Sequence, residues 1–292
     1  MDKEESYKYI KEFPAPTIEL LDIVFGEKKM LYIVLPLNNE EELQNKLQIL
    51  DKLDLKHEFK QSFNSLDELK REKRWDGEKY YLNVAIGKDS NIFKTFFENL
   101  SSSDVRGIGE NLGYPGCCIE EFPNHFDKHD AEEISLFAYE KSKKFNVYSF
   151  YNNRFLRFHD TGALIYHFPC NYGCKYSREI AKRRFKILKD LDSEKAKSMK
   201  NNLKSVIIYK VYESGDTVES RTDVLFSTDY EYNEEENIIH INNAFEDGRN
   251  LQDGSFKKQF EKVSKIEILD DNSFKLDGEK INDKNINIIA FN

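Results

Sequence analysis

Two pairs of cysteines stand in similar surroundings in this chain of 292 residues. Cys117 and Cys118 follow the run Gly113-Tyr-Pro-Gly, whereas Cys170 and Cys174 enclose Asn-Tyr-Gly. Each pair adjoins a segment with a helical pattern, so each is predicted to lie at a helix N-terminus, where the helix dipole and free backbone N–H groups stabilise a thiolate. The thiolate is the form of cysteine that binds metal ions or attacks sulfur. The four cysteines are therefore predicted to form one metal-binding site.

The residue spacing leaves the metal open between an iron-sulfur cluster and zinc. Zinc sites commonly use cysteines separated by two to four residues, which fits Cys170 and Cys174 but not the adjacent Cys117 and Cys118. Because adjacent side chains diverge, one of that pair is expected not to bind. Three thiolates with an open position suit an iron-sulfur cluster of the 4Fe-4S type, which is the first choice, or zinc completed by His167. The alternatives without metal are buried apolar cysteines or thiols that carry persulfide.

Three histidines near the cysteines differ in what their positions indicate. His125 and His129 are four residues apart, a spacing that places two side chains on one helix face, as in many metal sites. Their polar neighbours favour a solvated surface face instead. His167 lies three residues before Cys170, and it is the candidate for a catalytic proton donor or a further metal ligand.

A basic stripe begins directly after Cys174. Residues 175–189 have a helical pattern that places apolar residues on one face of the helix. The opposite face carries Lys175, Arg178, Lys182, Lys186 and Lys189. Residues 175–204 hold 11 basic and 4 acidic residues in a chain whose net charge is -9. Lys175, Arg178 and Lys182 are the candidates for binding an anionic substrate or RNA near the cysteines. The alternative is an ordinary solvated helix face.

Two runs of residues resemble the paired motif of an uncharacterised family of archaeal and bacterial proteins. They are Gly113-Tyr-Pro-Gly-Cys-Cys-Ile-Glu-Glu-Phe and His167-Phe-Pro-Cys-Asn-Tyr-Gly-Cys. In that family a Gly-Tyr-Pro-x-Cys-Cys element precedes a His-x-Pro-Cys-x3-Cys element. The resemblance covers about residues 80–190 and excludes the acidic C-terminal region. It implies no particular reaction, but it implies that one site includes Cys117, Cys118, His167, Cys170 and Cys174.

The composition favours a folded protein of the cytoplasm. Apolar residues make up 39% and aromatic residues 13% of the chain, which is enough for buried cores and excludes a disordered protein. The longest apolar run, residues 31–37, is far too short to span a bilayer. The charged N-terminal residues lack the apolar region of a secretory signal, so a cytoplasmic location is expected. In a reducing compartment, cysteines act as ligands or reactive thiols rather than as a disulfide framework.

The pattern of apolar residues predicts an α+β protein with three domains. Residues 1–100 form an N-terminal α/β domain with strands at 30–37, 56–63 and 80–86, and with a helix N-cap at Asn38 or Asn39. Residues 101–203 form a central, mainly helical domain that contains the cysteines, with helices at 130–145 and 174–189. Residues 204–292 form a small acidic β-rich domain with strands at 206–212, 223–227, 238–241, 263–269 and 286–291, and with turns at 270–272 and 277–278.

These features lead to three functional interpretations. The first is a cytoplasmic metalloprotein, taken to be an enzyme, whose iron-sulfur or zinc centre acts on an anionic or nucleic-acid substrate. The second is a zinc-stabilised module that binds RNA or protein. The third is a metal-free thiol or persulfide protein. The metal content of the purified protein distinguishes the three.

Overall fold

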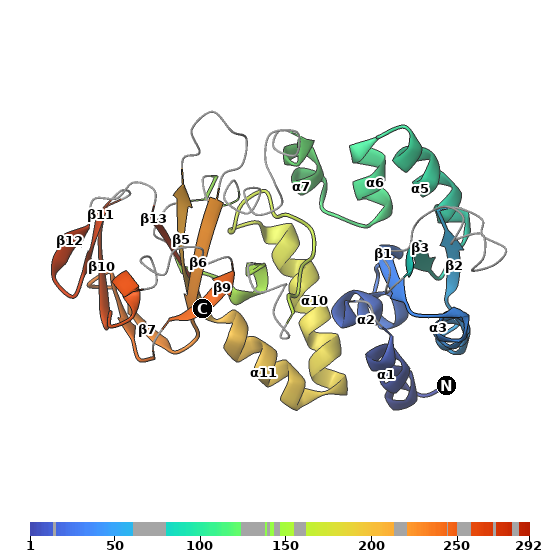
Figure 1. The fold of residues 1–292 in the computed structure, drawn as a ribbon, viewed down its shortest axis with the longest axis horizontal. Helices are drawn as coiled ribbons and strands as arrows, with labels where there is room; N and C mark the ends of the chain where they lie inside the picture. The colour runs from blue at the N-terminus through green and yellow to red at the C-terminus, as the bar shows by residue number, and fades with distance from the viewer. Residues whose placement is uncertain are drawn as a thin grey trace. The chain divides into compact units, whose positions relative to one another are not determined.

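The computed structural model describes residues 1–13, 16–60, 80–123, 138, 141–142, 147–154, 162–212, 221–243, 245–249, 258–270, 273–281 and 286–292. These residues form the helices and strands of a mixed α+β protein, which confirms the predicted class (Figure 1). The chain divides into two compact units, residues 1–123 with 182–196 and residues 124–181 with 197–292. In the described parts, no helix combines the length and the apolar character needed to cross a lipid bilayer.

The first unit is built on a three-stranded antiparallel sheet. Its strands are β1 (Met30–Leu37), β2 (Lys56–Phe59) and β3 (Tyr80–Gly87), in the order β1-β3-β2. The described helices before residue 123 are α1 (Lys3–Glu12), α2 (Thr17–Phe25), α3 (Glu40–Lys52), α5 (Asn91–Ser101), α6 (Val105–Asn111) and α7 (Gly116–Glu121). The three predicted strands are confirmed, although β2 ends at Phe59, and residues 61–63 of the predicted strand lie outside the described residues.

Two local features explain how the helices of this unit are placed. The side chain of Asn39 accepts a hydrogen bond of 2.8 Å from the backbone N–H of Glu42. This bond satisfies a free donor in the first turn of α3 and confirms the predicted N-cap. A fully buried core joins the sheet to α5 and consists of Met30, Ala85, Phe93 and Phe96. Burial of these apolar side chains holds α5 against the sheet.

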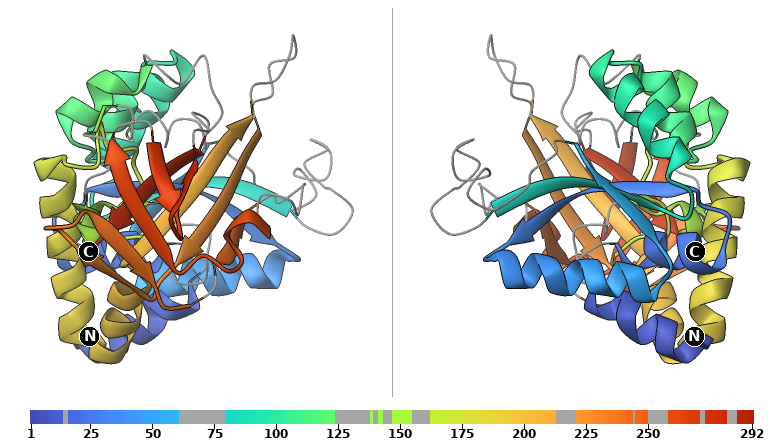
Figure 2. Two further views of the ribbon diagram at one scale, coloured as in Figure 1. Left: turned by 90° about the vertical axis from the view of Figure 1, so that its left-hand side faces the viewer. Right: turned by 90° about the vertical axis from the view of Figure 1, so that its right-hand side faces the viewer.

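The second unit contains two five-stranded sheets that share one core. One has the order β4-β13-β5-β6-β9 and the other β12-β11-β10-β8-β7. The strands are β4 (Val147–Tyr148), β5 (Ser205–Tyr212), β6 (Arg221–Ser227), β7 (Tyr230–Asn233), β8 (Ile238–Ile241), β9 (Glu246–Arg249), β10 (Lys265–Asp270), β11 (Ser273–Leu276), β12 (Glu279–Ile281) and β13 (Ile286–Phe291). Both sheets contribute side chains to this core, among them Ile208, Ile239, Ile266, Phe274 and Ile288. Their strands β5 to β13 are drawn in amber to red in Figure 2.

The five strands predicted after residue 204 are confirmed, but the described residues also form β7, β9, β11 and β12, which were not predicted. All five predicted strands are present, and β8 and β13 have the predicted bounds. The turn at Asp277 and Gly278 joins β11 to β12 as a two-residue loop, and its φ angles of 48° and 94° are those that a tight hairpin requires. Most of the helix predicted at 130–145, and two of the three residues in the turn at 270–272, lie outside the described residues.

Helices connect the cysteine region to the β-rich region. They are α10 (Lys175–Leu191) and α11 (Ser193–Leu203), and a short 3-10 helix, η1 (Phe150–Asn152), follows β4. Ala181 and Leu188 are buried, which confirms the inward face predicted for α10. The helix ends two residues later than the predicted pattern.

One strand pair links residues on both sides of the boundary predicted at residue 204. Strand β4 pairs in parallel with β13, so that Val147 lies opposite Ala290 and Tyr148 lies opposite Phe291. The second unit therefore combines residues from the predicted central domain with the β-rich region. The division into three domains at residues 100 and 203 stays a prediction.

Candidate metal centre

The first cysteine pair lies in the first turn of α7. Gly113 has a positive φ of 73°, which lets the chain turn sharply ahead of the helix. Pro115 is the N-cap residue, and its carbonyl oxygen accepts hydrogen bonds from the backbone N–H groups of Cys118 and Ile119, at 2.9 and 3.0 Å. Cys118 is 3% exposed, and Cys117 is half-buried. Their sulfur atoms lie 3.9 Å apart, so the adjacent side chains do not diverge.

The second pair encloses a short turn that leads into α10. The backbone N–H of Cys174 donates a hydrogen bond of 3.1 Å to the carbonyl oxygen of Asn171. The side-chain amide of Asn171 in turn lies 3.5 Å from the sulfur of Cys170 as a donor. Cys174 is 5% exposed, and Cys170 is half-buried. A hydrogen bond to sulfur stabilises the thiolate, as the outer residues of metal sites commonly do.

The sulfur atoms of Cys117, Cys118, Cys170 and Cys174 all lie within 4.8 Å of one another. Among the residues that the structure describes, this is a set whose donor atoms are close enough to hold one metal ion. An all-sulfur set suits zinc or iron. The prediction that the two cysteine pairs lie close together is therefore confirmed.

The histidines do not join this group within the described residues. His167 is 4% exposed, and its Nε2 atom lies 2.8 Å from the hydroxyl oxygen of Ser177 in the first turn of α10. His125 and His129 lie outside the described residues. A catalytic role for His167 stays a prediction.

The aromatic ring inside the second cysteine loop is docked on the sheet of its own unit. Tyr172 is fully buried, and its ring centroid lies 5.9 Å from that of Tyr148 and 5.3 Å from that of Phe291. Burial raises the pKa of Tyr172 well above its ordinary value, so the hydroxyl stays neutral. The loop between Cys170 and Cys174 therefore rests on strands β4 and β13.

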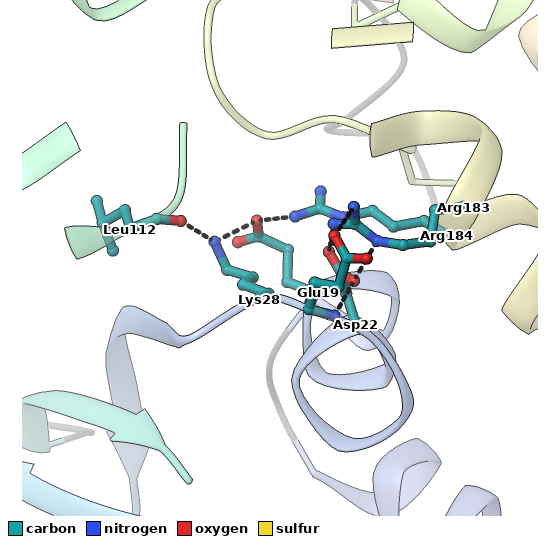
Figure 3. Close-up of polar contacts among 7 residues, drawn as sticks. Glu19, Asp22, Lys28, Leu112, Arg183 and Arg184 are labelled. Atoms are coloured by element: carbon teal, nitrogen blue, oxygen red, sulfur yellow. Dashed lines mark hydrogen bonds and ion pairs between the residues drawn. The ribbon is translucent and has the colours of Figure 1, made fainter. Parts of the chain in front are cut away.

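A buried network of charges supports the segment ahead of the first pair (Figure 3). The ammonium group of Lys28 lies 2.7 Å from the carbonyl oxygen of Leu112 and 3.1 Å from the carboxylate of Glu19. It also lies over the ring of Tyr114, 5.2 Å from the centroid. Leu112 and Tyr114 flank Gly113, which opens the motif that carries the first two cysteines. Lys28 thus holds the start of the cysteine loop.

Two arginine residues of helix α10 complete this network. Arg184 contacts Glu19 at 3.1 Å and Asp22 at 2.8 Å, and Arg183 bonds Asp22 and the exposed Glu27. Figure 3 shows the two carboxylates of α2 between Lys28 and the guanidinium groups of α10. This network was not predicted from the sequence. The feature of the sequence that indicates the network is a pair of acidic residues, three positions apart, inside the mainly apolar helix α2.

The network shifts the ionisation of its members. Burial raises the pKa of Glu19, but the charges of Lys28 and Arg184 outweigh burial and bring it below the ordinary value. Burial also raises the pKa of Asp22, but hydrogen bonds from Arg183 and the charge of Arg184 outweigh burial and bring it below the ordinary value. Burial lowers the pKa of Lys28 despite its attraction to Glu19. Both carboxyl groups therefore favour their charged form in the fold.

The predicted basic stripe lies largely on the outside of α10. Lys175, Lys182, Lys186 and Lys189 are exposed, whereas Arg178 is half-buried. The Nε atom of Arg178 is buried and has no hydrogen-bond partner among the described residues. We call these residues the basic face: Lys175, Arg178, Lys182, Lys186 and Lys189.

The sequence matches no known protein-family model, and no curated protein or solved structure is similar to it at a significant level. The cysteine group and the basic face are therefore the features on which a function can rest.

Proposed function

We propose that the chain is a zinc-stabilised binding module in which Cys117, Cys118, Cys170 and Cys174 hold one zinc ion. The observation that carries this proposal is the spacing of the four sulfur atoms, all within 4.8 Å of one another. A tetrahedral ion with Zn–S bonds of about 2.3 Å sets its ligand sulfurs about 3.8 Å apart. The 3.9 Å between the sulfurs of Cys117 and Cys118 agrees with that distance. Both adjacent cysteines can thus reach the same ion.

The same spacing favours a single ion over a 4Fe-4S cluster. In such a cluster each thiolate binds a different iron atom, which spreads the four sulfurs to separations on the order of 6 Å. The upper limit of 4.8 Å in this chain is shorter than that. Zinc therefore replaces the iron-sulfur cluster as the first choice.

Four thiolates also favour a structural role for the zinc. Catalytic zinc sites keep one position open for water or substrate, whereas four cysteines close the coordination sphere. Two of these cysteines are buried and two are half-buried, which limits the access of solvent. The proposal accordingly gives His167 the role of a buried support bonded to Ser177. It also includes membership in the family with the paired cysteine motif, because both elements of that motif supply ligands.

The partner of the module is proposed to be anionic, with RNA as its class. The basic face offers four exposed lysine side chains along one helix, and lysines of this kind contact phosphate groups. Arg178, which is half-buried, adds a guanidinium group to this face. An arginine of this type suits phosphate recognition.

The test of the zinc site is the metal content of protein purified without oxygen. We expect a colourless protein with one zinc per chain and no labile sulfide, and we expect Cys174→Ser to lose most of the zinc. Ala181→Ser is the matched control, because it adds a hydroxyl at a buried position of the adjoining helix without removing a thiolate. A brown protein with iron and labile sulfide would contradict zinc in favour of the iron-sulfur enzyme. Protein without metal would favour the thiol or persulfide interpretation.

A further inference from the structure

Asn152 clamps the second cysteine loop from a distant part of the same unit. Its side-chain amide donates one hydrogen bond of 2.7 Å to the carbonyl oxygen of Tyr172 and another of 3.2 Å to that of Cys174. The side chain is 1% exposed. Both acceptors belong to the turn that presents Cys170 and Cys174, so a single side chain sets the direction of two of its peptide groups.

The clamp stands on a rigid base. Asn152 ends η1, and the backbone N–H of Phe150 at its start donates a bond of 3.1 Å to the carbonyl oxygen of Asn292. The N–H of Asn292 returns a bond of 2.8 Å to the carbonyl oxygen of Tyr148. These bonds continue the parallel pairing of β4 with β13. The position of the Asn152 amide is thus tied to the sheet rather than to the loop that it holds.

The cost of burying this side chain argues for a specific role. The Oδ1 atom of Asn152 is buried and accepts no hydrogen bond from any described residue. A buried acceptor without a donor reduces the stability of the fold. An apolar residue of similar size would avoid that cost, but it could not donate to the two carbonyl oxygens.

We propose that Asn152 is a positioning residue for the metal site, which sets the geometry of the Cys170 and Cys174 thiolates before the ion binds. This inference rests on the proposed zinc site. Residues that orient the ligands of a metal raise its affinity without touching it, and their loss commonly weakens binding about 10- to 100-fold.

The neighbouring residue provides a matched control. Asn153 is also fully buried, and its side-chain amide also donates two hydrogen bonds, to the carbonyl oxygen of Leu203 at 2.7 Å and to the hydroxyl of Ser205 at 2.9 Å. These acceptors join α11 to β5 and lie outside the cysteine loop. Asn153→Ala therefore removes the same kind of clamp from the same unit without altering the loop.

The experiment compares zinc affinity and the visible spectrum of the Co²⁺-substituted protein in the wild type, Asn152→Ala and Asn153→Ala. Zinc affinity is measured by competition with a chelating dye on the full chain. We expect Asn152→Ala to weaken zinc binding about 10- to 100-fold and to change the Co²⁺ bands. We expect Asn153→Ala to lower the unfolding midpoint while leaving the zinc affinity and the Co²⁺ bands as in the wild type.

A second variant protects the test against loss of folding. Asn152→Asp keeps the shape of the side chain but turns an acceptor toward the two carbonyl oxygens, so it should weaken zinc binding as well. Equal zinc affinity and equal Co²⁺ spectra in the wild type and both Asn152 variants would overturn the positioning role alone. A wild-type protein that binds no zinc would overturn the proposed function, and the positioning role with it.

Discussion

The ammonium group of Lys28 donates a hydrogen bond of 2.7 Å to the carbonyl oxygen of Leu112, the C-cap residue of helix α6. Lys28 is buried and is paired with Glu19 on α2. A charge far from the cysteines in sequence therefore fixes the residue that precedes Gly113, where the first cysteine motif begins. Charged groups therefore support the first cysteine motif, whereas the neutral amide of Asn152 and the aromatic ring of Tyr172 support the second motif.

Replacement of Lys28 by methionine is expected to destabilise the first unit. Removal of one partner from a buried ion pair costs about 3–5 kcal/mol, and the lower figure applies because Arg184 still pairs with Glu19. The free energy of unfolding in urea measures the effect. Lys29→Met is the control, because Lys29 is exposed and its loss should cost less than about 0.5 kcal/mol. Equal losses in the two variants would contradict the network as a source of stability.

The same network predicts a loss of stability in acid. Glu19 and Asp22 have folded-state pKa values below their ordinary values of 4.5 and 3.8. Their stabilisation is therefore complete above those ordinary values and is lost as the pH falls through the lower folded-state values. The unfolding midpoint, followed from neutral pH down to about pH 3, should fall less steeply in Glu19→Gln than in the wild type. Parallel curves would show that Glu19 does not contribute to acid unfolding.

All four cysteines are expected to be needed for full zinc occupancy. The sequence suggested that one of the adjacent pair would tolerate replacement, but the 3.9 Å between the two sulfurs favours binding by both. Cys117→Ser and Cys118→Ser should therefore each lose most of the zinc and unfold at a midpoint that no longer depends on added zinc. Metal analysis after gel filtration measures this. Full occupancy in either variant would restore a three-thiolate site.

The contact between Tyr172 and Phe291 predicts that the β-rich region affects the metal site. Phe291→Ala and Phe274→Ala each empty a fully buried position of a sheet and should cost about 3–5 kcal/mol. Phe291 packs on Tyr172, whereas Phe274 belongs to the other sheet. Only Phe291→Ala is expected to lower the zinc affinity. If neither variant changes it, the region after residue 203 is independent of the site, as the sequence predicted.

Charge reversal on the basic face is expected to weaken RNA binding. In Lys182→Glu/Lys186→Glu, the dependence of binding on salt should become shallower, because fewer counterions are released. Lys258→Glu/Lys262→Glu changes the net charge equally at two other exposed lysines and should bind as the wild type does. Fluorescence anisotropy with a labelled single-stranded RNA across a salt series measures both. Equal loss in the two variants would show a nonspecific charge effect, and binding only to an acidic peptide would indicate a protein partner.

Features that depend on local sequence could be predicted. Alternation of apolar residues located β5, β6, β8, β10 and β13, but it missed β7, β9, β11 and β12. The N-cap Asn39 and the Asp277-Gly278 turn follow from the backbone preferences of these residue types. The convergence of the cysteines followed from the similar surroundings of the two pairs. The strands, the cap and the turn are each determined within a few residues, whereas the convergence joins two cysteine pairs that are far apart in the sequence.

Features that depend on the choice of a distant partner could not be predicted. Two acidic residues in α2 gave no indication that Arg184 would pair with them, because any basic residue could do so. Strand β4 has only two residues and pairs in parallel with a strand far along the chain, so it carries no pattern of its own. The clamp of Asn152 on Cys174 has the same origin, since an asparagine in a loop commonly bonds its own backbone.

The pairing of β4 with β13 determines which parts of the second unit can fold first while the chain is synthesised. The two strands lie about 140 residues apart in sequence, and contacts over such separations form slowly because a long loop must close first. A chain folds from its N-terminus while it leaves the ribosome. The turn that carries Cys170 and Cys174 therefore emerges well before β13, so the docking of Tyr172 on Phe291 must wait until almost all of this sequence has been synthesised.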